Sequence, residues 1–507
     1  MLRPSGSRLR LRGARWLRSP MARIVGDGTW TLTAKIISQV AQIAAFILAA
    51  RTLTSHEFGF YAYSSAFALL FVAIAEGGWG EFVLNTPEYR HRLSEVATIA
   101  IASGGLVTMF GLSATAVIDW YFQQPEEAAI IALFSCWILP SALSTVYDAV
   151  IVAEGRLRDL ALIRILGEAA GFAVVVLGIL SGWGVVSFVA GRLAYQLLVL
   201  AASIVAVRWL PAIRLDWTFC RELLAFSRHI VANRFIILFR SYSATILVGS
   251  FLGLAEAGYY RAAERIVAAI SELVGEPARI LAWFNLRKAA ASSDDPAAAR
   301  LEIGRTATSL MTVLVTVSLP IYVGLALIAD PLVRVVLGDT WAPTATLLSL
   351  LALKQVLLIP GYVTEPLLTL SGNIRRMPPA VLINSLVGVG LLLALAPFGM
   401  LAAALGQCAA SVVSFLVSVR LQSRYGSMRW DTVLRDCSFS LFALLAMIVA
   451  VITFSSMAGM LSVAGAPSIA LQVAIGTLIY FATLAAGHRL GFATFPVLGP
   501  RGPLNRG

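Results

Sequence analysis

Apolar residues gather in about 14 long stretches along this chain, and short polar connections separate them. A helix that crosses the hydrocarbon core of a bilayer needs about 20 apolar residues, which is the length of these stretches. The pattern predicts an all-α polytopic membrane protein. Its expected spans are 31–53, 58–83, 95–118, 128–153, 159–180, 184–207, 229–252, 257–284, 306–329, 342–370, 378–396, 400–419, 437–458 and 467–487.

Lys and Arg residues fall almost entirely in every second connection between these spans. The basic connections include Arg90 and Arg92, Arg156 and Arg158, Arg208 to Arg234, Arg287 to Arg305, Arg375 and Arg376, and Arg420 to Arg435. The connections at 119–127, 181–184, 396–400 and 457–467 contain neither residue, and Arg334 is the main exception. Because short loops that retain positive charge stay in the cytoplasm, both termini are expected to be cytoplasmic and the helix count even.

The composition agrees with a membrane protein and excludes several other classes. Of 507 residues, 59% are hydrophobic and 13% are charged, which is too apolar for a soluble protein of this size. The net charge of +12 follows from the loop arginines, so no nucleic-acid partner is expected. Four single cysteines and four scattered histidines predict no disulfide and no metal site. Since the chain also lacks a P-loop motif, we expect no cofactor, and any work it does would draw on an ion gradient, the membrane potential or a substrate's own gradient.

The first 30 residues form a basic segment with two interpretations. Its arginines, Arg3, Arg8, Arg10, Arg12, Arg15 and Arg18, surround Trp16, as in an arm that lies on anionic lipid headgroups. The alternative is a disordered extension upstream of a start at Met21. The apolar run that follows is too long for a signal peptide, so an uncleaved first helix is expected.

Two short segments of the first half recur in the second half. Residues 53–61 align without gaps to 252–260, and both copies place Glu, Gly and an aromatic residue at a helix junction. Residues 155–158 resemble 372–375. The recurrence predicts a duplication of six helices, although Gly-aromatic helix starts also recur by chance at membrane interfaces. The expected domains are a basic arm at 1–30, an N-lobe at 31–208, an amphipathic link at 209–228, a C-lobe at 229–420, two further helices within 421–490, and a tail at 491–507.

The junction L-x-x-x-E-F-G-x-Y at 53–61, its copy at 252–260 and the two G-x-x-R turns resemble the Wzx-type polysaccharide transporters of the multidrug/oligosaccharidyl-lipid/polysaccharide flippase superfamily. The resemblance covers about residues 30 to 490. It implies two six-helix lobes around a central cavity, two C-terminal helices, and transfer of undecaprenyl-diphosphate-linked sugars across the bacterial inner membrane. One departure is the stretch 76–81, Glu-Gly-Gly-Trp-Gly-Glu, where many members carry Asp-x-Gly.

Charged residues inside the expected spans are the candidates for function. Each charge at the centre of a span costs about 2.5–3.5 kcal/mol on insertion scales, so these residues should face water or one another. Arginine suits a diphosphate because its planar group donates two parallel hydrogen bonds. The candidate head-group ligands are Arg192, Arg240, Arg261, Arg265 and Lys354. On the helix 257–284, a stripe from Arg261 to Arg279 also allows local pairing, such as Arg261 with Glu264.

Three acids within the spans, Glu76, Glu272 and Glu276, have two possible roles. They are candidates for coupling to protons or sodium, since carboxylates at membrane depth commonly serve ion pathways. The favoured alternative is that they act as counter-ions to Arg261, Arg265 or Arg279.

Three functions remain after these exclusions. The first is a flippase for a polyprenyl-diphosphate-linked oligosaccharide, with the lipid bilayer and a polysaccharide polymerase or export machinery as partners. The second is a cation-coupled drug exporter, which would need an acidic cavity. The third is a membrane glycosyltransferase, polymerase or ligase. It is disfavoured because the longest outer connection, 330–341, is short and no catalytic constellation is visible, so no enzyme activity is expected.

Overall fold

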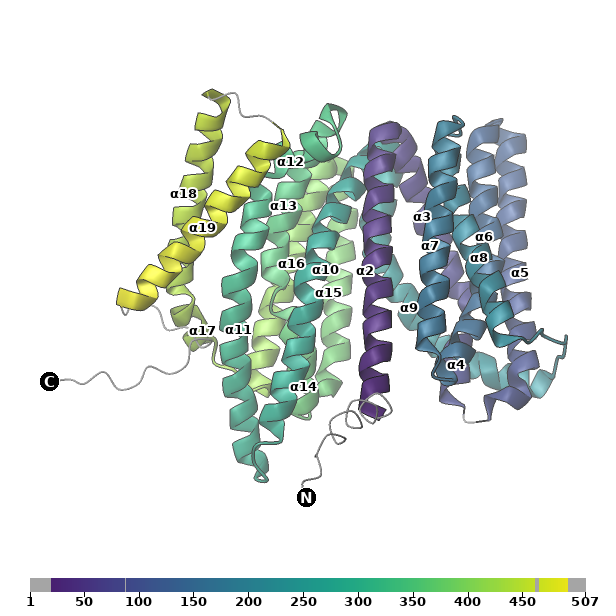
Figure 1. The fold of residues 1–507 in the computed structure, drawn as a ribbon, viewed down its shortest axis with the longest axis horizontal. Helices are drawn as coiled ribbons and strands as arrows, with labels where there is room; N and C mark the ends of the chain where they lie inside the picture. The colour runs from purple at the N-terminus through teal and green to yellow at the C-terminus, as the bar shows by residue number, and fades with distance from the viewer. Residues whose placement is uncertain (1–19, 87, 461–464, 491–507) are drawn as a thin grey trace, which may run out of the picture. The chain divides into compact units, whose positions relative to one another are not determined.

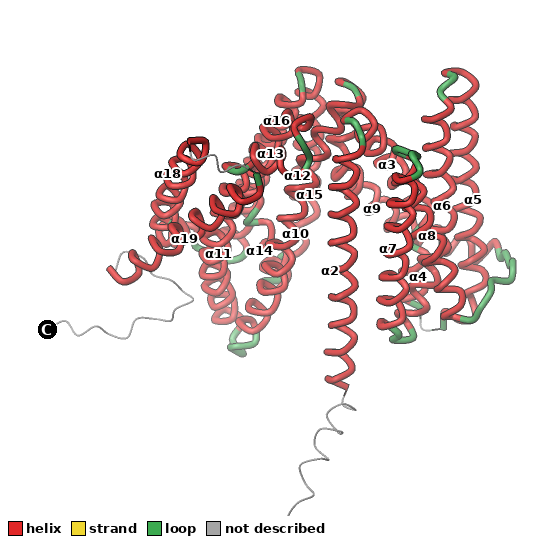
Figure 2. The backbone as a smooth tube through the Cα atoms, turned by 45° about the horizontal axis from the view of Figure 1, so that its top comes forward, coloured by secondary structure: helices red, strands yellow, loops and turns green. Residues whose placement is uncertain are grey.

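The computed structural model describes residues 20–86, 88–460 and 465–490, and every regular element within these ranges is a helix (Figure 2). The expected all-α fold is confirmed. The arginines of the basic arm from Arg3 to Arg18 and the tail at 491–507 lie outside the described residues. The first described helix begins at Pro20.

The chain divides into two compact units, Met1–Tyr242 and Ser243–Gly507. Helix α9 contributes residues to both. The helices of unit 1, labelled in Figure 1, are α2 (Pro20–Thr52), α3 (Ser55–Glu76), α4 (Trp79–Asn85), α5 (Tyr89–Phe122), α6 (Pro125–Ala153), α7 (Leu157–Leu180), α8 (Val186–Val207) and α9 (Trp217–Leu252).

Unit 2 contains the remaining helices and three short 3-10 turns. They are α10 (Leu254–Ala290), α11 (Pro296–Leu327), α12 (Ala329–Val336), η1 (Asp339–Trp341), α13 (Ala342–Leu358), α14 (Gly361–Leu370), η2 (Ile374–Arg376), α15 (Met377–Leu395), η3 (Ala396–Phe398), α16 (Met400–Tyr425), α17 (Trp430–Asp436), α18 (Ser438–Met460) and α19 (Ala466–Leu490). The last two helices lie side by side (Figure 1).

The expected number of spans is compatible with this structure. Within the described residues, 13 candidate spans are long and apolar enough to cross a membrane. The remaining expected span, 257–284, lies in α10. This helix has 37 residues, but it carries more charged residues than the candidate spans do. Two expected spans are interrupted. Span 58–83 breaks at Gly77 and Gly78, and span 342–370 breaks at Pro360, which has no N–H to continue the helix.

The second recurring segment adopts the same backbone structure at 155–158 and at 372–375. Gly155 and Gly372 follow α6 and α14 with φ of 70° and 75°, the left-handed conformation that glycine adopts at helix ends. The N–H of Arg156 donates to Ile151 O at 3.0 Å, and the N–H of Asn373 donates to Leu368 O at 2.7 Å. The same helix-ending hydrogen bond therefore closes both copies, which favours duplication over chance.

The segment 209–228, expected as an amphipathic link, is divided in the structure. Residues 209–216 are not helical, and α9 begins at Trp217. Asp216 starts this helix by accepting from the Thr218 N–H at 2.9 Å. Hydrogen bonds from the Thr218 hydroxyl and backbone hold the pKa of Asp216 below its ordinary value. The second half of the expected link is thus the beginning of α9.

Arg334, the exception in the arginine pattern, is paired with acids on both sides. Its guanidinium lies 3.0 Å from Asp330 and 3.3 Å from Asp339. The hydrogen bond to Asp330 contributes most to raising the pKa of Arg334. Two carboxylates therefore balance this cation locally, although Arg334 remains an exception to a rule that counts Lys and Arg alone.

Glycines allow close contacts at two places in unit 1. At the junction of α3 and α4, Gly77 and Gly78 have φ of 56° and 79°, and the indole of Trp79 covers Gly77. Helices α7 and α8 meet at Gly171 and Gly191. A Cβ atom at Gly191 would lie 2.7 Å from the carbonyl oxygen of Gly171. Small residues permit such backbone contact between membrane helices.

Candidate functional site

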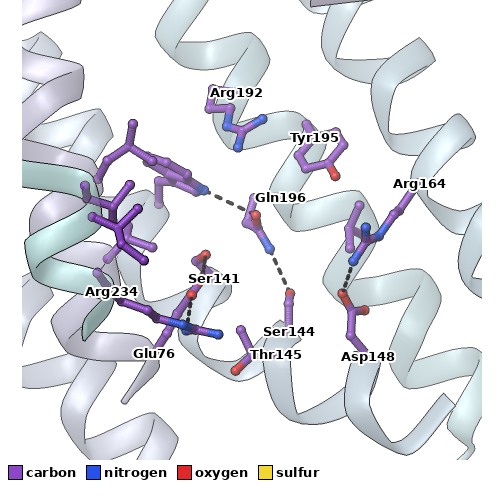
Figure 3. Close-up of a pocket in the computed structure, with 17 residues that line it drawn as sticks. Glu76, Ser141, Ser144, Thr145, Asp148, Arg164, Arg192, Tyr195, Gln196 and Arg234 are labelled. Atoms are coloured by element: carbon purple, nitrogen blue, oxygen red, sulfur yellow. Dashed lines mark hydrogen bonds and ion pairs between the residues drawn. The ribbon is translucent and has the colours of Figure 1, made fainter. Parts of the chain in front are cut away.

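Unit 1 contains a cavity of about 550 Å³ between α3, α6, α7, α8 and α9 (Figure 3). Its lining combines charged and hydroxyl-bearing residues with apolar ones. The lining residues are Leu69, Val72, Ala73, Glu76, Trp137, Ser141, Ser144, Thr145, Asp148, Arg164, Arg192, Tyr195, Gln196, Val199, Arg234, Ile237 and Leu238.

Helical periodicity gathers these residues from each helix. On α6, Trp137, Ser141, Ser144 and Asp148 are spaced by four, three and four residues, so they share one face. On α8, residues 192, 195, 196 and 199 share a face in the same way. Each stripe is polar within an otherwise apolar helix, and the two stripes face the same cavity.

Glu76 connects three helices at one end of the cavity. The hydroxyl of Ser141 donates to its Oε1 at 2.9 Å, and Arg234 Nη1 of α9 donates to its Oε2 at 3.1 Å. Arg234 also pairs with Glu81 of α4. The hydroxyl of Ser227, earlier on α9, donates to the Gly77 carbonyl. Helix α9 thereby contacts the break itself and the helices on each side of it, α3 and α4.

A second network crosses the middle of the cavity. The indole of Trp137 donates to Gln196 Oε1 at 3.2 Å, and Gln196 Nε2 donates to Ser144 Oγ at 2.8 Å. All three side chains belong to buried residues. Buried amide and indole groups need such partners, so this chain of hydrogen bonds fixes α6 against α8.

The other two arginines of the cavity differ in their surroundings (Figure 3). Arg164 of α7 binds Asp148 at 3.2 Å. The guanidinium carbon of Arg192 lies 4.9 Å from the ring centroids of both Trp137 and Tyr195. Within the described part of the chain, no carboxylate forms an ion pair with Arg192. Its charge is stabilised by the faces of two aromatic rings.

Of the five expected head-group cations, Arg192 is the one that lines this cavity. Arg240 lies exposed on α9, outside the lining. The other three belong to unit 2. There, Arg261 pairs with Glu264 at 3.3 Å, as the local alternative expects, and Lys354 donates to Gln407 at 3.4 Å. Arg265 lies one turn further along α10.

The three expected acidic residues also separate between the units. Glu276 pairs with Arg279 at 2.8 Å, the counter-ion arrangement that the sequence favours. Glu272 is exposed on α10. Glu76 also has an arginine partner, but that partner is Arg234 rather than an arginine of α10.

Several residues of the cavity were not identified as site residues from the sequence. Arg234 was counted among the cytoplasmic arginines, because it lies near the start of the span expected at 229–252. Since α9 begins at Trp217, Arg234 lies nearly five turns inside the helix. The polar stripe of Ser141, Ser144 and Asp148 was a usable signal, because hydroxyls and a carboxylate recur on one face of an apolar helix.

Comparison with known proteins agrees with this architecture. Residues 47–346 match the family model described as polysaccharide biosynthesis protein. The chain is 20% identical to the teichuronic acid biosynthesis protein TuaB of Bacillus subtilis (strain 168), over 66% of this chain and 68% of that protein. It is 24% identical to the succinoglycan biosynthesis transport protein ExoT of Rhizobium meliloti (strain 1021), over 65% and 66%.

Two solved structures have the same fold at low sequence identity. The lipid II flippase MurJ in an inward closed conformation aligns with a TM-score of 0.66 and 13% identity, over 90% of this chain and 98% of that one. An inward-facing multidrug resistance MATE family transporter of the MOP superfamily aligns with a TM-score of 0.56 and 15% identity, over 78% and 98%. The family match covers more than half of the chain, and the many apolar helices agree with it. This chain is therefore a multi-pass membrane protein that belongs to the polysaccharide biosynthesis protein family.

Proposed function

We propose that this protein is a flippase that moves a lipid-linked oligosaccharide across the bacterial cytoplasmic membrane for export of a surface polysaccharide. The observation that carries the proposal is a polar cavity, with three arginines, inside helices apolar enough to span a bilayer. Family membership, the transport protein ExoT among the relatives, and a fold shared with a lipid II flippase support it.

The cargo in this proposal is an oligosaccharide on undecaprenyl diphosphate. The candidate ligands of its diphosphate are four of the expected cations. They are Arg240 on α9 of unit 1, and Arg261, Arg265 and Lys354 on α10 and α13 of unit 2. Alternating access would expose these groups first to the cytoplasm and then to the outside. The polyprenyl chain would remain in lipid, because transfer of its apolar surface to water is unfavourable.

A cation-coupled drug exporter shares the fold but fits the cavity less well. Organic cations need an excess of acidic groups, whereas the lining of the unit 1 cavity has three arginines and two carboxylates, Glu76 and Asp148. An organic cation in this cavity would be repelled by the arginines, because like charges repel strongly in a medium of low dielectric. Glu76 and Glu276 are accordingly assigned as the counter-ions of Arg234 and Arg279.

The test is a strain that lacks the gene. The expected result is loss of the surface polysaccharide and accumulation of a lipid-linked oligosaccharide on the cytoplasmic leaflet. Mass spectrometry of the lipid extract identifies the intermediate, and its inaccessibility to a sugar-modifying enzyme added outside spheroplasts establishes the leaflet. An unchanged polysaccharide and unchanged lipid extract, together with increased drug sensitivity, would instead support the exporter.

A further inference from the structure

Arg192 is the cation of the unit 1 cavity that has no acid to balance it among the described residues. Arg164 binds Asp148 at 3.2 Å, and Arg234 binds Glu76 at 3.1 Å. Arg192 instead contacts the rings of Trp137 and Tyr195. Charged residues within membrane helices are costly even with such contacts, and they commonly mark the path of a substrate.

The rest of the cavity has the character of a small-molecule site. Its volume of about 550 Å³ lies within the range of about 300–1,000 Å³ that such sites occupy. Hydroxyls of Ser141, Ser144 and Thr145 line one side, and Gln196 lies between them and Arg192 (Figure 3). Aromatic faces, hydroxyls and an amide are the groups that bind the apolar faces and hydroxyls of a sugar ring.

We propose that this cavity is a subsite for one acidic sugar of the transported oligosaccharide, with the sugar carboxylate bound by Arg192. This inference rests on the proposed function and specifies which cargo it favours. The sugar would replace or stack beside the aromatic contacts of the guanidinium. Arg192 would then donate two parallel hydrogen bonds to the carboxylate, the geometry in which arginine binds this group most strongly.

The charge pattern favours a sugar carboxylate over the diphosphate of the lipid carrier. A diphosphate carries at least two negative charges and needs several cations around it. In this cavity the charges of Arg164 and Arg234 are already matched by Asp148 and Glu76, which leaves a single guanidinium for a ligand. A single guanidinium matches a ligand group with one negative charge.

The test uses the full chain in lipid nanodiscs and two soluble probes, methyl glucuronide and methyl glucoside. These probes differ only at C6, which is a carboxylate in the glucuronide and a hydroxymethyl group in the glucoside. Saturation-transfer NMR should report binding of the glucuronide at least about tenfold tighter than that of the glucoside, the effect of one charge-assisted hydrogen bond. Equal binding of the two probes, or binding of neither, overturns the proposal without any need for a variant.

Two further arms locate the site and identify its ligand. Arg192→Gln should reduce glucuronide binding to the level of the glucoside, whereas Arg305→Gln, a control in an exposed ion pair of unit 2, should leave it unchanged. Glucuronide binding that survives Arg192→Gln overturns the assignment. Displacement of the glucuronide by pyrophosphate at a lower concentration than by free glucuronate would assign the cavity to the carrier diphosphate and also overturn it.

The outcome of this binding experiment is independent of the test of the proposed function. Binding of the probes in nanodiscs requires no translocation, and the lipid extract of the deletion strain requires no acidic subsite. A deletion strain that accumulates a lipid-linked oligosaccharide, combined with equal binding of both probes, would retain the flippase and remove the subsite alone.

Discussion

Arg234 of α9 binds Glu76 of α3 at 3.1 Å, and the same guanidinium also binds Glu81 of α4 beyond the helix break. One cation therefore joins the two segments that Gly77 and Gly78 separate. Arg234 and Glu76 are partly buried, with side-chain exposures of 31% and 21%. An arginine shared between two carboxylates in such a position stabilises the corner and fixes where Glu76 faces the cavity.

Arg234→Gln should lower the stability of the folded protein, because two partly buried carboxylates lose their partner. We expect a loss of about 1–3 kcal/mol, the usual cost of leaving such groups unsatisfied. Thermal unfolding of the detergent-solubilised protein measures it. The matched control is Arg305→Gln, whose pair with Glu302 is exposed and has an N–O distance of 3.7 Å. Equal unfolding temperatures for the two variants would contradict the role of Arg234.

Gly77→Ala should prevent formation of the corner between α3 and α4. A Cβ atom at this position would lie 2.0 Å from Trp79 Cζ2, in addition to the strain of a positive φ. Gly155→Ala is the control, because it has a φ of 70° but open space around its Cβ, so it isolates a strain of about 1 kcal/mol. The yield of monodisperse protein in size-exclusion chromatography compares them. Similar yields would show that Trp79 moves at little cost.

Gly191→Ala should loosen the contact between α7 and α8 and thereby displace Arg192. The added Cβ would lie 2.4 Å from Val175 Cγ2 and 2.7 Å from the Gly171 carbonyl oxygen. We expect destabilisation of about 1–3 kcal/mol, as for overpacking. Gly388→Ala, in a helical position with no atom within 4 Å, should be neutral or stabilising. If both variants unfold at the wild-type temperature, the close approach is not required.

Arg240→Gln and Arg265→Gln should each abolish export of the surface polysaccharide while the protein remains in the membrane. The physical reason is loss of a permanent cation at the proposed diphosphate site. Immunoblots of membranes and a polysaccharide assay on a complemented deletion strain measure the two quantities. Normal export by both variants would remove the head-group assignment, and Arg305→Gln provides the control for loss of a positive charge alone.

The arginine pattern predicts opposite sides of the membrane for two exposed serines. In a variant without its four native cysteines, Ser181→Cys should react with a membrane-impermeant maleimide added to intact spheroplasts, because its connection contains no Lys or Arg. Ser292→Cys, which lies near Arg287 and Arg300, should react only after the membrane is permeabilised. The reverse labelling would place both termini outside.

Local properties of the chain determined the helices and the turns between them. High hydropathy over about 20 residues indicates a membrane span regardless of how that segment packs in the fold. The expected spans therefore agree closely with α5 to α8. The turns at 155–158 and 372–375 depend on a glycine at a helix end, which is another local property. Both turns have the same backbone structure. Local pairing on α10, Arg261 with Glu264, also follows from helical spacing.

Only the tertiary structure decided which charges meet. Arg234 and Glu76 are more than 150 residues apart, and Arg192 reaches Trp137 across two helices, α6 and α8. Such contacts depend on how helices rotate and approach, for example at Gly171 and Gly191, and hydropathy does not encode that rotation. The sequence determined a bundle of membrane helices with charges inside it. The packing of those helices decided that Glu76 is held by Arg234 and that Arg192 lies against the rings of Trp137 and Tyr195.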